Sequence, residues 1–250
     1  MQLMPLSEWN AAENQLAVAI MPGAFGAHIG VAYTAEGGQR KVLHLQWHMK
    51  LENQAIPVES GPRWIAVPIA IPPIACKQVV AIVRAVAATK PAIGYGLHSQ
   101  LVGHSFDQSG NYTPVAGSDG LTCATFVYEL FAGCAVKLID LTTWKPTLKG
   151  FFWGNDVYQL LEKKQASVDH LKAVRRNING LRLHPLEIAA AASSGPKAWP
   201  LDYQVACSGA DRVEVAARRY SSVRTTRGFV RATIQSLLGK QDFLRDIEYF

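Results

Sequence analysis

The chain has 250 residues, of which 49% are hydrophobic and 18% are charged, and its formal net charge is +6. This balance excludes an intrinsically disordered chain, and four cysteines in 250 residues exclude a small fold built on disulfides. The length predicts one or two domains with room for a proper core.

Three apolar segments near the start predict strands of an antiparallel sheet. Gln15–Met21 ends at a Pro-Gly pair, and residues 27–33 follow a glycine-rich turn. Arg40–His48 follows a second turn, and its alternation places His44 and Gln46 on one face and the apolar side chains on the other. Strand, glycine turn and strand predict a hairpin. Residues 63–70 are a further extended segment.

Two helices are expected in the first 150 residues. Ile74–Thr89 has apolar residues at helical spacing and ends before a proline, and Leu121–Phe131 ends before Gly133. Ser118 and Asp119 are candidate N-caps of the second helix. The polar, glycine-rich stretch between the helices, residues 94–120, predicts a long loop, and long loops in compact domains are often functional.

Positive charge gathers in the last 100 residues. Residues 1–150 carry 10 Lys and Arg against 9 Asp and Glu, whereas residues 151–250 carry 15 against 10. We expect a short strand at 136–141, amphipathic helices at 151–183, a linker or loose helix end at 187–200 and an arginine-rich segment at 209–239. The predicted domains are therefore a first part, 1–150, which contains the candidate catalytic residues introduced below, and a helical, basic C-terminal extension, 151–250. The extension is either a solvated basic face or a contact for an anionic surface.

Cys123 stands out among the cysteines because it follows a glycine-rich loop and opens an apolar helix. A thiol in the first helical turn faces unpaired backbone N–H groups and the positive end of the helix dipole, and both favour the nucleophilic thiolate. The alternative is a buried structural cysteine. A catalytic thiol also needs a proton partner and a group that orients it, and His28 and His44 lie on neighbouring strands of the predicted hairpin.

The segment from His28 to Tyr33, followed by Val42-Leu43-His44-Leu45, resembles the His-Val-Gly-Ile-Tyr and Ile-His-Ala patterns of NlpC-type papain-like cysteine peptidases. Residues 123–127, Cys-Ala-Thr-Phe-Val, resemble the Cys-Ser-Gly-Phe-Val helix of that family. The histidine hairpin precedes the cysteine helix here, as in the circularly permuted branch that includes lecithin:retinol acyltransferase-like proteins and bacterial amidases and effectors. The resemblance covers about residues 15–140.

The resemblance implies an α+β, papain-like fold in permuted order, with the antiparallel sheet packed on the nucleophile helix. It also implies Cys123 as nucleophile, His28 as base and His44 as the third polar group. Two departures are Thr122, where the family often has Asp, and the 16-residue spacing between the histidines. Gln46, on the same strand face as His44, is an alternative third residue.

Other polar residues could contribute to substrate binding. Tyr95 and Thr122 are candidates for lining the cleft, and Tyr95 could help an oxyanion site. His98 and His104, with Asp107, could contact substrate or bind a metal, but no spaced ligand motif is present, and no metal or other cofactor is predicted. The arginine-rich segment lacks interleaved aromatic residues, so a nucleic acid is not a predicted partner.

The predicted function is a cysteine hydrolase that cleaves an amide through a Cys thioester, with a peptide or peptidoglycan-like substrate such as a stem peptide. The start of the chain resembles no secretory signal, so we expect synthesis in the cytoplasm and possible export as an effector. Two alternatives remain open: a lipid acyltransferase or thioesterase of the permuted branch, and a non-catalytic binding module on the same fold.

Overall fold

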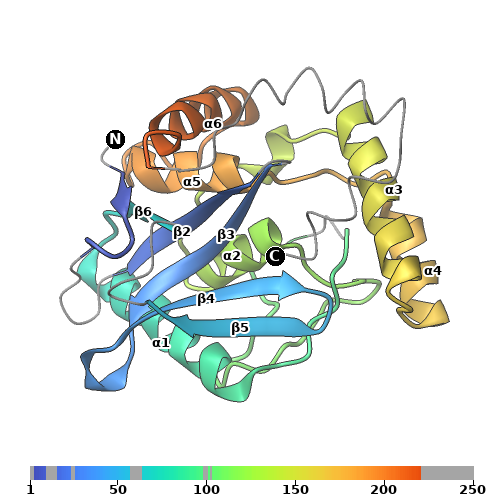
Figure 1. The fold of residues 1–250 in the computed structure, drawn as a ribbon, viewed down its shortest axis with the longest axis horizontal. Coiled ribbons are helices and arrows are strands. Elements are labelled where there is room, and N and C mark those ends of the chain that lie inside the picture. Colours follow the sequence, from blue (N-terminus) through green and yellow to red (C-terminus); the bar gives the residue numbers. More distant parts are fainter. Residues whose placement is uncertain are drawn as a thin grey trace.

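The computed structural model describes residues 3–9, 16–23, 26–56, 64–97, 101 and 103–220. Six strands form one antiparallel sheet in the order β1-β6-β2-β3-β4-β5, and helices pack against it (Figure 1). The α+β class is confirmed. The strands are β1 Met4–Pro5, β2 Leu16–Gly23, β3 Gly26–Thr34, β4 Arg40–Trp47, β5 Lys50–Ala55 and β6 Ile65–Pro68.

The three leading strand predictions and the extended segment at 63–70 are confirmed to within a few residues, but β5 was not predicted. It follows β4 through a tight turn in which Met49 has a positive φ of 56°. Residues with positive φ are usually Gly or Asn, so this turn carries no sequence signal. The β4–β5 hairpin extends the sheet at one edge.

The pairing of β3 differs between its two neighbours. Along β2 the register is complete, from Leu16 opposite Tyr33 to Gly23 opposite Gly26. Along β4 it covers only Val31–Thr34. The first half of β3 and the second half of β4 are therefore unpaired with each other and border an opening in the sheet, while β5 pairs along the other edge of β4.

The sheet has two different faces. Ile29, Val31, Leu43 and Leu45 belong to the main hydrophobic core, together with the helices. A smaller cluster on the other face contains alanines of β2, β3 and β6 with Val42, and it is covered by Leu6, Trp9 and Trp64. Strand alternation places the His28 and His44 side chains on this second face.

Six α-helices complete the described part of the chain, and α2 packs on β3 and β4 while α5 packs on β2, β3 and β6 (Figure 1). The helix predicted at 74–89 is confirmed as α1. The helices are α1 Pro73–Thr89, α2 Cys123–Ala132, α3 Leu148–Lys163, α4 Val168–Asn177, α5 Pro185–Ser194 and α6 Tyr203–Ala217.

Three predictions were wrong. Helix α2 begins at Cys123, and its N-cap is Thr122, which forms a reciprocal capping box with Thr125, so Ser118 and Asp119 do not cap it. Residues 136–141 form no strand; Ile139 makes a single parallel bridge to Leu201. The predicted linker at 187–200 contains most of α5, whose residues 185–192 are all buried in the main core.

The C-terminal region is helical as far as it is described. The amphipathic stretch at 151–183 contains two helices, α3 and α4, which pack on each other. Because α5 shares a core with the sheet, its residues pack with the predicted catalytic part; the boundary at residue 150 stays a prediction. Residues 221–250, with most of the arginine-rich segment, lie outside the described residues. No described helix is long and apolar enough to cross a membrane.

Candidate functional site

The two predicted histidines meet across the opening between β3 and β4. His28 Nε2 lies 2.8 Å from His44 Nδ1, and both rings are buried. The Trp64 ring covers them, with centroids 5.7 Å from His28 and 5.1 Å from His44. The prediction that paired strands bring these two side chains within hydrogen-bonding distance is therefore confirmed.

The Cys123 thiol reaches the same opening from the helical side of the sheet. It is the first residue of α2, and its sulfur accepts hydrogen bonds from the backbone N–H groups of Ile29 and Ala124. Ile29 is the residue next to His28 in β3 and lies outside the β3–β4 ladder. The thiol is thus anchored to the backbone of the residue that follows the predicted base, whose own side chain lies on the other face of the sheet.

Burial sets the protonation state of the thiol. It raises the pKa of Cys123 from 9.0 to about 11, although the two backbone N–H groups, Arg182 and the Tyr95 hydroxyl all lower it. The expectation of a lowered thiol pKa is wrong for this conformation. A helix N-terminus favours the thiolate, but here removal from water is the larger effect.

The histidines are neutral for the same reason. Burial, with a smaller contribution from the neighbouring His44, lowers the pKa of His28 to about 3, and burial lowers the pKa of His44 to about 4. Moving the thiol proton to His28 in this state would cost on the order of 10 kcal/mol before the attraction between the resulting charges is counted. The resting site therefore contains a thiol and two neutral imidazoles.

Tyr95 lies beside the thiol. Its hydroxyl donates to the Cys123 sulfur and accepts from the Cys123 backbone N–H, while its ring packs on Trp47 with centroids 4.4 Å apart. Backbone N–H groups at a helix start and a tyrosine hydroxyl are suitable donors for an oxyanion. The structure brings this sequence-predicted residue to the nucleophile.

Two histidines that sequence reasoning missed hold the Tyr95 backbone. The Tyr95 N–H donates to His48 Nδ1 at 3.2 Å, and His170 Nε2 lies 3.1 Å from the Tyr95 carbonyl oxygen. Their rings lie against each other, with centroids 4.3 Å apart. His48 comes from the turn after β4 and His170 from α4, so no local motif connects them.

The other predicted side chains close to the site have separate roles. Thr122 caps α2 and lines the adjacent cavity. Gln46 lies on the same face of β4 as His44, but its buried Oε1 has no hydrogen-bond partner among the described residues. His44 Nε2 is likewise buried without a well-aligned partner in that part of the chain, and the Gln54 side chain on β5 favours its protonated form. Of the two candidates for third residue, His44 makes the contact with His28.

Arg182 is a second residue that sequence reasoning missed. With Thr122, Trp153 and Leu97 it lines a cavity between the start of α2 and the α3–α4 region. Its guanidinium lies 4.1 Å from the centre of the Trp153 ring, and its charge reaches Tyr95 and Cys123. Arg182 belongs to the C-terminal part of the chain, where no residue with a chemical role was predicted.

The loop candidates do not join the site. His104 is exposed, and Asp107 binds the backbone and side chain of Asn111 and the backbone of Ser109 within its own loop. His98 lies outside the described residues. Within those residues no group of three or more His, Cys, Asp or Glu side chains could hold a metal ion.

Comparisons with protein-family models, curated proteins and solved structures gave no match to this chain.

Proposed function

We propose that the protein is a cysteine hydrolase of papain-like, circularly permuted NlpC type, which cleaves an amide through a thioester on Cys123. The single observation that carries this proposal is the His28–His44 contact of 2.8 Å at the opening where the Cys123 thiol binds the Ile29 N–H. A helix-borne thiol, a buried imidazole and a second imidazole on the neighbouring strand are the parts that acyl transfer to cysteine requires.

The acylation step follows from the ring contacts. As the sulfur attacks the substrate carbonyl carbon, the thiol proton passes to the His28 ring, which His44 holds at Nε2. The oxyanion accepts from the Cys123 backbone N–H and the Tyr95 hydroxyl, which give up their resting bonds to the hydroxyl and to the sulfur as the substrate binds. His28 then gives the proton to the leaving amine, the C–N bond breaks, and a thioester remains.

In deacylation His28 acts as a base a second time, now toward water. Water enters as the amine leaves, His28 takes its proton, and attack on the thioester carbon releases a carboxylic acid and restores the thiol. His44 acts throughout as a positioning residue that holds the His28 ring and accepts the Nε2 proton. Because the resting pair is neutral, proton transfer accompanies attack on the substrate rather than preceding it.

The substrate class proposed is a peptide amide, with a peptidoglycan stem peptide as the first substrate to test and export as an antibacterial effector as the cellular setting. Purified peptidoglycan is digested, and the products are identified by mass. Cys123→Ala and His28→Ala should each lower turnover by about 1,000-fold or more. Cys134→Ala, just after α2, is the matched control and should keep full activity.

The proposal fails if the Cys123→Ala variant still cleaves the substrate. Inactivity of every form, together with a Cys123 thiol that no reagent modifies, would identify a non-catalytic binding module.

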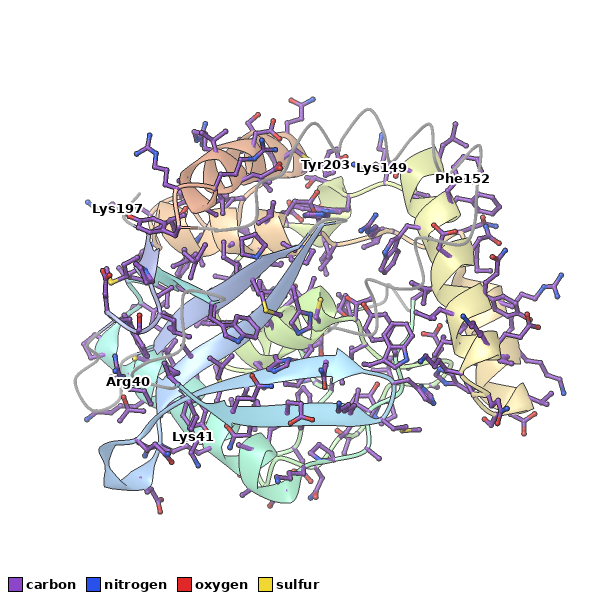
Figure 2. The ribbon with its side chains drawn as sticks, viewed as in Figure 1. Arg40, Lys41, Lys149, Phe152, Lys197 and Tyr203 are labelled. Carbon is purple, nitrogen blue, oxygen red and sulfur yellow. The ribbon has the colours of Figure 1, made fainter. Side chains whose placement is uncertain are left out.

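A lipid acyltransferase or thioesterase is the second candidate, and an exposed apolar tip on α3 favours it. Leu148 is 78% exposed and Phe152 is 63% exposed, and Lys145 and Lys149 flank them. Figure 2 shows Lys149 and Phe152 at the same end of α3, with Phe152 pointing away from the body of the protein. Aromatic and basic side chains together are typical of a surface that binds anionic membranes, and the basic C-terminal half would add to it.

The two candidates differ in the bond that is broken. The lipid enzyme is selected if the protein hydrolyses or transfers acyl esters of phospholipid vesicles and does not cleave stem peptides. This acyl-ester activity should then be lost in both Phe152→Ser and Cys123→Ala. Peptide cleavage that Phe152→Ser leaves unchanged would select the amidase.

A further inference from the structure

Arg182 is a largely buried cation, and the Glu187 and Asp156 carboxylates act on its charge only from beyond salt-bridge distance. The salt bridges among the described residues are Lys50–Glu52, Lys172–Asp169 and Arg218–Glu214, so Arg182 has no carboxylate within 4.0 Å in that part of the chain. Its Nε is buried and has no hydrogen-bond partner there. Burial of an unpaired guanidinium is costly, which is a reason to expect a ligand.

The nearest buried acid is already bound elsewhere. Glu187 Oε2 accepts from the His184 backbone N–H at 2.8 Å and from the Trp144 indole at 3.3 Å, while its Oε1 accepts from the Cys207 thiol. Burial raises the pKa of Glu187, and the Arg182 charge acts in the opposite direction. Arg182 therefore lines the cavity with no carboxylate bound directly to its guanidinium among the described residues.

The walls of the cavity favour a flat, anionic group. The Trp153 ring stacks on one face of the Arg182 guanidinium. The Thr122 hydroxyl lies at the start of α2, next to Cys123, and Thr122 also lines the cavity. A stacked arginine keeps its hydrogen-bonding edge directed sideways, and this edge matches the two oxygens of a carboxylate. The positive end of the α2 dipole adds to the attraction.

We propose that Arg182 binds a carboxylate of the substrate in this cavity, so that the site acts on acidic peptides that carry a free carboxylate close to the cleaved amide. This inference rests on the proposed function and names the substrate class of that site. Arg182 is a specificity residue that selects one charge of substrate over the other.

The test uses two alkylating reagents that differ in charge, iodoacetate and iodoacetamide. In both reactions the Cys123 sulfur attacks the CH₂ carbon, a C–S bond forms, the C–I bond breaks, iodide leaves, and the thiol proton goes to buffer. Rates for the Cys123 peptide are measured by mass spectrometry on the full chain at pH 10. The quantity compared is the ratio of the iodoacetate rate to the iodoacetamide rate.

Arg182→Gln should lower this ratio by about tenfold, because it removes a charge-assisted contact with the anionic reagent only. Arg182→Lys should keep a ratio above that of Arg182→Gln. The matched control is Arg175→Gln, which removes an exposed arginine that also lies over an aromatic ring, Tyr158, at 5.9 Å. This control should keep the wild-type ratio.

Equal ratios in the wild type, Arg182→Gln and Arg182→Lys, with Cys123 still modified by iodoacetamide, would overturn the inference and leave the proposed hydrolase standing. Absence of peptide cleavage, together with a Cys123 that neither reagent modifies while Cys134 reacts, would instead overturn the hydrolase and the inference with it. Thermal unfolding of each variant shows whether Arg182→Gln folds. If it does not, the neutral variant Arg182→Met takes its place, and a ratio in Arg182→Met equal to the wild-type ratio overturns the carboxylate role.

Discussion

Three buried histidines should make the folded protein sensitive to acid. Burial lowers the folded-state pKa of His28 to about 3, of His44 to about 4 and of His184 to about 3, from 6.5 in the unfolded chain. Below pH 6.5 the unfolded chain binds protons that the folded protein does not, so the free energy of unfolding falls as the pH falls. The loss stops when the pH reaches the folded-state pKa, and above pH 6.5 these groups contribute no pH dependence.

The magnitude follows from the size of these shifts. Between pH 6.5 and 4.5 each buried histidine lowers the free energy of unfolding by about 2 kcal/mol. Three of them approach the entire stability of a typical domain, roughly 5–15 kcal/mol. Glu187 opposes this over part of the range, because its raised folded-state pKa lets the folded protein keep a proton that the unfolded chain releases.

His44→Gln is the perturbation that isolates one histidine, because glutamine keeps a polar partner for His28. Urea unfolding is followed at pH 7.5, 6.5, 5.5 and 4.5. From pH 6.5 to 4.5 the variant should lose about 2 kcal/mol less than the wild type. His104→Gln, which replaces an exposed histidine, is the matched control and should follow the wild-type curve. Parallel curves for His44→Gln and the wild type would refute the reasoning, because His44 would then bind protons equally in both states.

Three further changes test other contacts. Tyr95→Phe removes the hydroxyl beside the Cys123 N–H and should lower amidase kcat by about 10- to 100-fold, with less effect on KM; an unchanged kcat would remove Tyr95 from the oxyanion site. Gly30→Ala places a Cβ 2.8 Å from the His44 Cβ and from the Leu43 carbonyl oxygen, and should cost about 1–3 kcal/mol in urea unfolding. Glu129→Ala leaves the Gly103 and Ser105 N–H groups unpaired, and faster hydrogen exchange at these two amides is expected, at a cost of about 2–4 kcal/mol in stability; unchanged exchange would contradict this anchoring role.

The parts of the site that local patterns encode could be predicted from the sequence. Alternation along β4 places His44 and Gln46 on one face, and the glycine turn pairs this strand with the one that carries His28. These two facts place both imidazoles on one face of neighbouring strands, but the ladder ends at Val31 opposite Leu43, so the 2.8 Å contact itself does not follow from the register. The glycine-rich loop and the apolar run likewise predict a helix that begins close to Cys123.

The parts that depend on distant segments could not be predicted. Helix α5 is buried along its length and consists largely of alanine, so it has no polar face and no amphipathic period that would distinguish it from a linker. His170 and Arg182 reach the site only because α3, α4 and the segment before α5 fold back toward Tyr95 and Thr122. The pKa of Cys123 was predicted in the wrong direction because burial depends on these same contacts.

The neutral resting site has a consequence for mechanism. Transfer of the Cys123 proton to His28 costs on the order of 10 kcal/mol, and in an ion pair only the attraction between the two charges would offset this cost. A general-base mechanism avoids most of this cost, since the developing charge is transferred to a carbonyl oxygen that the Cys123 N–H and the Tyr95 hydroxyl stabilise. Arg182 lowers the thiol pKa further, and if it binds an anionic substrate as proposed, substrate binding and thiol activation would occur together. A site of this kind reacts slowly with small reagents and quickly with a substrate that fills the cavity, and this contrast separates it from a pre-ionised cysteine enzyme.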